Sequence, residues 1–345
     1  MRAIRRATSS SSSAGPGIRD RLVLVRRLAL LLVAAACGNS SAEPADSGAD
    51  GSFDGAALDA SSDASSGSDA ADANAADASD AQSTIWQPGT GSLPWQWELD
   101  HAIDTSNAKD MGTGDETYAG SNADDPVVYD IDGFDNDAAQ VTALHGLGKK
   151  VICYIEVGAA ESYRSDYSQF PATALGKTVD GYAQEKYLDI GDATVVTVIE
   201  ARIAMCSQKG FDGVEPDIDD SYTDDTGFSI TESSNVAYLV TLSQYAHSLG
   251  LAWGLKNGGD GGTPTKFVSD MLPHVEFAVV EEPFYLNTIG YFHPALYDAG
   301  KAMFVAEYTN DTSSASSFCP TALSDHTNAA LFDVALDGAT RTPCE

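Results

Sequence analysis

The feature that most constrains the fold of this chain is a series of eight short apolar runs between residues 95 and 334. Each run is rich in β-branched or aromatic residues and is bounded by turn residues, as buried β-strands are. We therefore expect eight strands, at residues 95–99, 127–131, 151–156, 213–217, 251–256, 276–281, 302–307 and 329–334.

Helix-like stretches separate most of these strands, at 136–147, 193–209, 232–249 and 265–272. Strands that alternate with helices form a parallel sheet, and eight such units close into a barrel. The interval after the first strand is rich in Gly and Asp and predicts a loop. The sequence therefore predicts an α/β fold, a (β/α)8 TIM barrel, as a single domain over residues 84–345.

Residues 1–37 predict an export signal, because seven arginines precede an apolar run at 28–36 that is too short to span a bilayer. The segment Ala34-Ala35-Ala36-Cys37 resembles a bacterial lipobox, so we expect a lipid on Cys37 that attaches the protein to a membrane. The alternative is ordinary secretion after cleavage near these small residues. The expected location is the cell envelope, as a lipoprotein, or the outside of the cell.

Residues 38–83 predict a disordered linker. They are almost entirely Ala, Ser, Asp and Gly, with ten acidic residues and no Lys or Arg. Such a segment buries too little apolar surface to offset its conformational entropy, and repulsion among its carboxylates keeps it extended.

The chain is strongly acidic, with a formal net charge of −32. Nucleic acid is excluded as a partner, since phosphate contacts need a basic face. A cationic polymer would be attracted by such a field, although the charge also has a simpler reading as a source of solubility. We expect a monomer.

Four cysteines follow Cys37, an even number in an exported chain, and this predicts two disulfides. We expect Cys319 to pair with Cys344, and Cys153 to pair with Cys206. No spacing is typical of a zinc site, and the six histidines do not cluster. We therefore expect no metal and no cofactor.

Acidic or amide residues gather where several predicted strands end. A barrel builds its active site at the carboxyl ends of its strands, and unpaired acids there are costly unless they serve a polar pocket. A single acid at a strand end is more often a helix cap or a surface charge. The residues at these ends are Asp130, Asp132, Glu156, Asp217, Lys256, Asn257, Glu281, Glu282 and Glu307.

Strand alternation selects among these residues, because alternate side chains point into a barrel. Three pairs share an inward face: Tyr154 with Glu156, Glu215 with Asp217, and Val279 with Glu281. Cys153 then points outward, toward the helix that carries Cys206.

Six segments, at 95–99, 129–132, 153–158, 209–217, 254–257 and 306–308, together resemble glycoside hydrolase family 114, the endo-α-1,4-polygalactosaminidases. The resemblance extends over nearly the whole predicted barrel. It implies that the barrel is a catalytic domain that hydrolyses an amino-sugar polysaccharide.

The family motif has an Asp at the tip of the fourth strand and a Glu at the tip of the sixth, which correspond to Asp217 and Glu281. Two carboxylates on either side of a sugar are what glycoside cleavage requires. The resemblance therefore implies that Asp217 is the nucleophile and Glu281 the acid/base of a retaining mechanism, with carboxyl groups roughly 5 to 5.5 Å apart.

The remaining candidates are expected to contact substrate. Lys256 and Asn257 would donate hydrogen bonds to sugar oxygens or hold Asp217 ionised, and Trp97 and Tyr154 would offer rings to a sugar face. For each, a buried ion pair or a packed ring is an equal alternative. The other members of this set are Asp130, Asp132, Glu156, Glu215, Glu307 and Tyr308.

Three positions depart from the family pattern: Ile218 replaces a usual Asn, Pro283 a usual Cys, and Glu156 a small or amide residue. They leave open the choice of substrate but not the reaction class. One alternative is a hydrolase of another α-linked polysaccharide, and another is a barrel that binds glycan without cleaving it. A metal-dependent deacetylase is disfavoured, because the histidines lie mostly away from strand tips.

Overall fold

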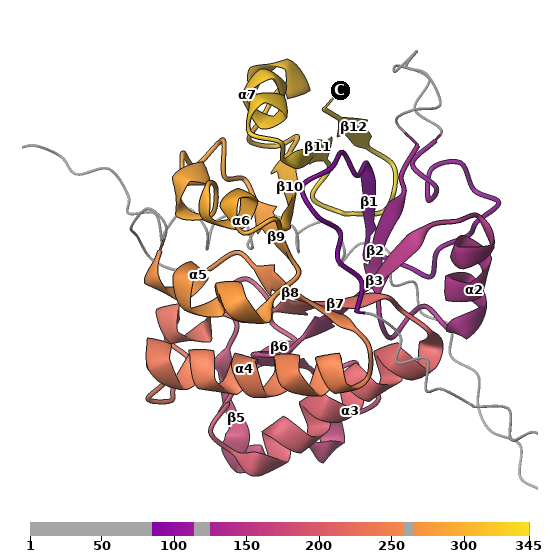
Figure 1. Cartoon of the computed structure of the whole chain (residues 1–345). Coiled ribbons are helices and arrows are strands. Elements are labelled where there is room, and N and C mark those ends of the chain that lie inside the picture. Colours follow the sequence, from indigo (N-terminus) through magenta and orange to yellow (C-terminus); the bar gives the residue numbers. More distant parts are fainter. Residues whose placement is uncertain (1–84, 114–124, 259–264, 345) are drawn as a thin grey trace, which may run out of the picture.

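The computed structural model describes residues 85–113, 125–258 and 265–344. Eight parallel strands form a nearly closed barrel in chain order (Figure 1), which confirms the expected fold. The export signal at 1–37, the linker at 38–83 and Cys37 lie outside the described residues. The barrel strands are β1 (Trp95–Glu98), β2 (Val128–Asp132), β3 (Lys150–Glu156), β7 (Gly213–Asp217), β8 (Ala252–Lys256), β9 (Phe277–Glu281), β10 (Ala302–Tyr308) and β11 (Asn328–Phe332).

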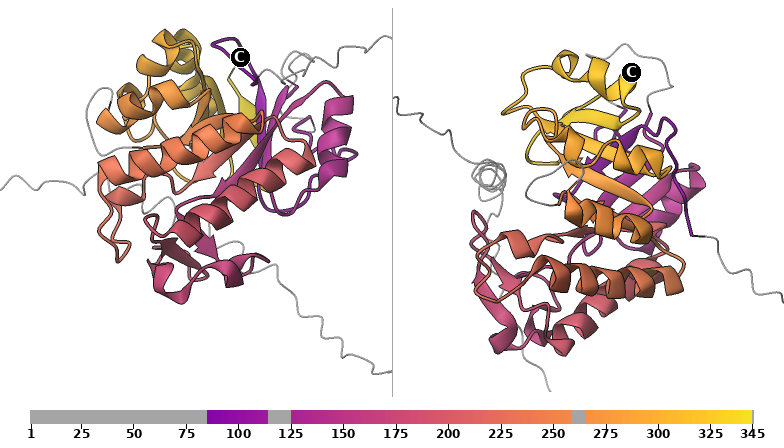
Figure 2. Two further views of the ribbon diagram at one scale, coloured as in Figure 1. Left: turned by 60° about the horizontal axis from the view of Figure 1, so that its bottom comes forward. Right: turned by 60° about the vertical axis from the view of Figure 1, so that its left-hand side comes forward.

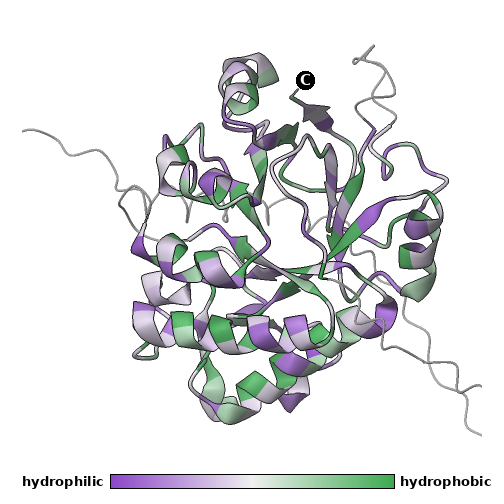
Figure 3. Cartoon of the chain, in the orientation of Figure 1, coloured by the Kyte–Doolittle hydropathy of each residue, from purple (hydrophilic) through white to green (hydrophobic). Residues whose placement is uncertain are grey.

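Helices surround these strands, and Figure 3 shows hydrophilic and hydrophobic residues alternating along the two longest of them. Each long helix begins at a side chain that accepts a backbone N–H: Asp137, Asp192 and Thr231 cap α2, α3 and α4. The α-helices are α2 (Ala138–Gly146), α3 (Ala193–Lys209), α4 (Glu232–Ser248), α5 (Lys266–Met271), α6 (Ala295–Asp298) and α7 (Cys319–Ser324). None of the helices in the described residues is long and apolar enough to cross a membrane.

Strand alternation divides the apolar residues into two cores. Val151, Cys153 and Ile155 of β3 face outward and pack with the helices. Ile152 of the same strand faces inward and packs with residues such as Phe304 that fill the barrel. Apolar side chains therefore fill the barrel interior, and the polar side chains at the carboxyl ends of the strands lie above this packed core.

The barrel closes through a short ninth strand, β12 (Arg341–Pro343), which pairs antiparallel with β11. The guanidinium of Arg341 donates to the main-chain oxygen of Trp95 at 2.6 Å, which joins this hairpin to β1. Strand β11 ends at Phe332, two residues earlier than expected, because the Asp333 carboxylate accepts the N–H groups of Ala335 and Leu336 and forms a turn.

A second, antiparallel sheet was not expected from the sequence. It contains β4 (Ala159–Glu161), β5 (Leu175–Thr178) and β6 (Glu185–Leu188), in the order β4-β6-β5. Its strands are only three or four residues long and mix apolar with polar residues, so they lack the apolar run that marks a barrel strand. Figure 2 shows this sheet beside α3, and it follows directly from the end of β3.

Two disulfides join the residues that the sequence paired, Cys153 with Cys206 and Cys319 with Cys344. The first links β3 to α3 beneath the barrel wall, and both of its cysteines are fully buried. The second links α7 to the C-terminal segment. Disulfides persist in oxidising compartments, so both bonds are consistent with export.

Removing the first disulfide with Cys153→Ala and Cys206→Ala is expected to destabilise the fold more than removing the second. The bonds close loops with sequence separations of 53 and 25, so the lost chain entropy corresponds to about 4 and about 3.5 kcal/mol. Urea unfolding of both double variants checks the order. A larger loss for the Cys319–Cys344 bond would contradict it.

Candidate active site

Three successive strands bring three charged side chains together at the carboxyl end of the barrel. Lys256, at the end of β8, places its ammonium nitrogen 3.5 Å from a carboxylate oxygen of Asp217 on β7 and 3.7 Å from one of Glu281 on β9. The two carboxylate side chains are each 17% exposed, so a substrate can reach them. The ammonium itself is only 3% exposed and lies beneath them.

A left-handed residue follows each of these three strand tips and turns the chain sharply. These residues are Ile218, Asn257 and Glu282, with φ of 56°, 49° and 51°. Asn is enriched in this conformation, whereas a β-branched residue is strained there by about 1 to 2 kcal/mol. The usual Asn of the family would therefore relieve strain that this chain carries at Ile218. The side chain of Ile218 is buried against the smaller sheet, and this packing offsets the strain.

Each of the two carboxylates is held by a tyrosine hydroxyl and a second donor. Asp217 accepts the Tyr154 hydroxyl at 2.7 Å and the N–H of Ile218 at 2.9 Å. Glu281 accepts the Tyr308 hydroxyl at 2.5 Å and the side-chain amide of Asn257 at 2.9 Å. These bonds fix both carboxylates in place, which is what positioned acid, base or nucleophile groups require.

Two buried acidic residues lie next to Lys256. The Lys256 ammonium donates to Glu215 at 2.7 Å, and the negative charge of Glu215 acts in turn on the fully buried Asp130. Burial and the Glu215 charge raise the pKa of Asp130 well above its usual value. Burial alone would lower the pKa of Lys256, but the carboxylates of Asp217, Glu215 and Glu281 raise it, so the lysine stays charged.

Amide variants of Asp130 and Glu215 are expected to lose very different amounts of unfolding free energy. The raised pKa of Asp130 favours its neutral form, so Asp130→Asn replaces one uncharged group by another, and the unfolding free energy should fall by less than about 1 kcal/mol. Glu215→Gln removes the buried partner of Lys256 and should cost about 3 to 5 kcal/mol. Urea unfolding measures both, and equal losses would show that Asp130 is charged in the folded protein.

Trp97 belongs to this group through its ring. Its centroid lies 4.7 Å from the Lys256 ammonium, and the ring stacks against Tyr308. Because Trp97 is only 1% exposed, its face is occupied by the lysine and is not open to a sugar. The expected stacking role is thus replaced by support of the charged lysine.

Two expected site residues do not converge on the carboxylates. Glu307 points to the outer side of β10, where it accepts the N–H of Phe284 at 2.9 Å and holds the loop after β9. Burial raises the pKa of Glu307 to about 7. Asp132 is paired with Arg164, which also bonds Glu161. Both carboxylates bond to residues of the loops around the site.

Two residues that support the site were not predicted from the sequence. Arg202 lies on α3 among apolar neighbours and donates to the main-chain oxygen of Glu156, to Glu161 and to Asp166. Asp219 is buried and accepts the N–H of Lys256 at 2.9 Å. A lone arginine on the apolar face of a predicted helix was the available signal for the first.

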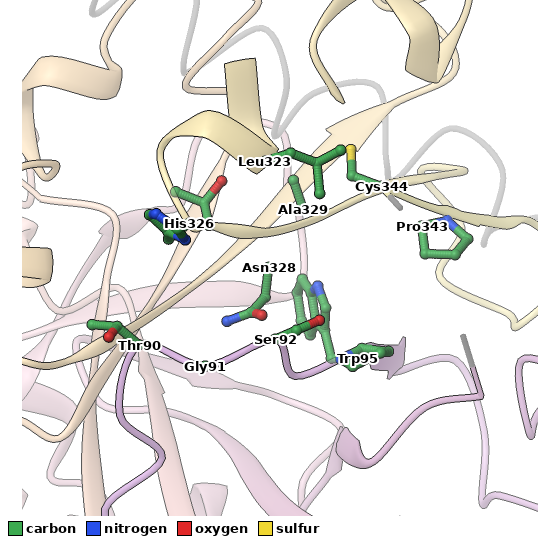
Figure 4. Close-up of a pocket in the computed structure, with 12 residues that line it drawn as sticks. Thr90, Gly91, Ser92, Trp95, Leu323, His326, Asn328, Ala329, Pro343 and Cys344 are labelled. Atoms are coloured by element: carbon green, nitrogen blue, oxygen red, sulfur yellow. The ribbon is translucent and has the colours of Figure 1, made fainter. Parts of the chain in front are cut away.

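Two hollows lie at the opposite end of the barrel from these carboxylates. One, of about 100 Å³, lies where β1 and β11 begin, and Figure 4 shows Trp95, Asn328 and Cys344 around it. The other, of about 640 Å³, lies near Lys150 and Leu251, where β3 and β8 begin. The amino ends of barrel strands serve stability, so neither hollow is a candidate active site.

Comparisons with known proteins agree with this arrangement. The family model for glycoside hydrolase family GH114 matches residues 75–345. Ega3 from Aspergillus fumigatus, solved in complex with galactosamine, is 28% identical with a TM-score of 0.64, over 74% of this chain and 96% of that one. The glycoside hydrolase domain of PelA from Pseudomonas aeruginosa is 14% identical with a TM-score of 0.53, over 70% of this chain and 96% of that one, and supports the fold.

No curated protein sequence matches the chain. The family model nevertheless covers well over half of its length, including every described strand and helix. The chain therefore belongs to family GH114 and is a glycoside hydrolase.

Proposed function

We propose that this enzyme cuts internal α-1,4 linkages in a polymer of galactosamine and N-acetylgalactosamine outside the cell. Asp217 acts as the nucleophile and Glu281 as the general acid and base of a retaining mechanism. The observation that carries this proposal is the convergence of both carboxylates on the Lys256 ammonium.

The spacing of the carboxylates favours retention. Because one nitrogen lies 3.5 Å from Asp217 and 3.7 Å from Glu281, the two oxygens involved cannot be more than about 7 Å apart. Retaining enzymes place these groups about 5 to 5.5 Å apart, whereas inverting enzymes need about 6.5 to 9.5 Å to admit a water molecule. This limit, which applies to one oxygen of each carboxylate, supports the shorter spacing of a retaining enzyme.

The reaction proceeds in two steps. Glu281 protonates the glycosidic oxygen while Asp217 attacks the anomeric carbon, which gives a glycosyl ester on Asp217 and releases the shortened chain. Glu281 then takes a proton from water, and the resulting attack on the anomeric carbon frees Asp217. The Lys256 ammonium and the Tyr154 hydroxyl stabilise the carboxylate form of Asp217 before and after these steps.

The acidic character of the chain supports a cationic substrate. A formal net charge of −32 attracts a polymer with free amino groups and raises its concentration near the enzyme. The similar enzyme Ega3 was solved with galactosamine, a sugar of this kind. Among the described residues, no group of three or more His, Cys, Asp or Glu is placed to hold a metal ion.

Product analysis by mass spectrometry tests the proposal. Incubation with partly deacetylated poly-galactosamine should yield short oligosaccharides of several lengths early in the reaction, as internal cleavage requires. Single sugars alone would overturn the endo pattern. Released acetate with an intact polymer would indicate a deacetylase, and an unchanged polymer that co-sediments with the protein would indicate a binding protein.

The proposed location of the enzyme at the cell surface depends on Cys37. We propose that this cysteine carries a lipid that holds the barrel at the cell surface through the linker at 38–83. Cys37→Ser should then move the enzyme from the membrane fraction to the medium. Equal membrane association of the variant would indicate another anchor.

A further inference from the structure

We propose that Glu156 binds the ammonium group of the sugar held against Asp217, and that it gives this enzyme a preference for deacetylated galactosamine units. The inference rests on the proposed function and deepens it.

Strand register places Glu156 beside the nucleophile. Glu156 is the last residue of β3, and its Cα is paired with that of Asp217, the last residue of β7. Tyr154, two residues earlier on the same strand, points inward and reaches the Asp217 carboxylate. Alternation therefore directs Glu156 to the same inner side, one layer above Tyr154 and next to Asp217.

One oxygen of the Glu156 carboxyl, Oε2, is buried without a hydrogen-bond donor in the described part of the chain. The residue is only 4% exposed, and its Oε2 atom has no hydrogen-bond partner among the described residues. Arg202 is the nearby cation, but its donors go to the main-chain oxygen of Glu156 and to Glu161 and Asp166. A buried carboxyl oxygen with no hydrogen-bond partner is costly, which is typical of a group that completes its contacts with a ligand.

The charges around Glu156 explain why the missing partner is a cation. Burial and the negative charges of Glu161, Glu185 and Asp217 raise its pKa well above the usual value, and Arg202 only partly opposes them. The direction of this shift favours the neutral form of Glu156 in the free enzyme. An ammonium supplies the absent positive charge and donors, so the carboxyl ionises and releases one proton on binding.

The position of the ammonium follows from the chemistry of the sugar. Asp217 attacks the anomeric carbon, C1, and the amino group of galactosamine is on the adjacent carbon, C2. A residue beside the nucleophile is therefore placed to meet the C2 substituent. An N-acetyl group is uncharged and larger, so it gains nothing from this carboxyl.

Glu156→Gln in the full-length protein tests the inference with two oligomers that differ only in acetylation. We expect kcat/KM for the galactosamine oligomer to fall about 10- to 100-fold, the effect of losing one charged hydrogen bond. For the N-acetylgalactosamine oligomer it should change less than about 3-fold. Glu200→Gln, on α3 and away from the carboxylates, should leave both values unchanged and serves as the control.

Calorimetric titration of the galactosamine oligomer in two buffers of different ionisation enthalpy gives a second readout. The parent enzyme should release about one proton on binding and Glu156→Gln none. If the glutamine variant does not fold, Glu156→Asp keeps the charge and should retain part of the preference. Equal losses on both oligomers, or unchanged proton release, would overturn the inference and leave the proposed function intact. A parent enzyme that cleaves neither oligomer would remove both.

Discussion

Asp217→Asn is expected to lower kcat on poly-galactosamine by more than about 1,000-fold while leaving the fold unchanged. The amide oxygen carries no charge and is a poor nucleophile, so no glycosyl ester forms. Asp217 accepts the Tyr154 hydroxyl and the Ile218 N–H on different oxygens, so the single amide oxygen can keep only one of these two bonds. Losing one such bond should lower the melting temperature by only a few degrees.

Initial rates and thermal unfolding of the purified variant measure the two effects. Residual activity above about one hundredth of the parent rate, in a variant shown free of parent enzyme, would remove Asp217 from the nucleophile's role.

Glu281→Gln is expected to lower kcat on the polymer by about 100- to 10,000-fold, the usual contribution of a positioned general acid. The loss should depend on the leaving group. A sugar that leaves as an alkoxide needs a proton, whereas an activated aryl group leaves without one, so the first step on an aryl galactosaminide should be nearly unaffected.

Glu282→Gln is the matched control for this prediction. Glu282 adjoins Glu281 on the same strand end but is fully buried, and burial raises its pKa to about 9. It is therefore already neutral near pH 7, and its amide should retain parent activity within about 3-fold. Pre-steady-state rates on the aryl substrate decide the assignment, since an equal loss on polymer and aryl substrate would show that Glu281 is not the acid.

The sequence was sufficient for the barrel and for the orientation of its central strands. Apolar runs mark strands buried on both faces, and a period of two then fixes which side chains point inward. This reasoning placed Cys153 on the helix side, where it meets Cys206, and placed Asp217 and Glu281 together at the inner rim.

The same alternation, applied to the full length of β10, predicts that Glu307 points away from the site. Adjacent residues of a strand cannot both face inward, and Tyr308 is the one that reaches Glu281. Glu307 was grouped with the site because the expected strand ended there, whereas β10 continues to Tyr308. The error came from the strand boundary, which depends on hydrogen bonds that the apolar pattern does not reveal.

Other features depend on contacts between distant segments. The short strands β4, β5 and β6 have no apolar run of their own. They are held by backbone pairing with one another and by packing of Ile218 against Ala159 of β4. Closure of the barrel uses Arg341 and the main chain of Trp95, which are far apart in the sequence. The occupation of the Trp97 ring by Lys256 likewise follows from packing, which composition does not show.

The most direct test of the proposed mechanism is intact-mass measurement of Glu281→Gln after mixing with an aryl α-galactosaminide. The aryl group leaves without protonation, but no base remains to activate water, so the glycosyl-enzyme should accumulate. We expect the protein mass to rise by one galactosaminyl unit, and peptide mapping to place that unit on Asp217. An adduct on another residue, or release of the aryl group with no adduct and with an inverted sugar product, would contradict the account.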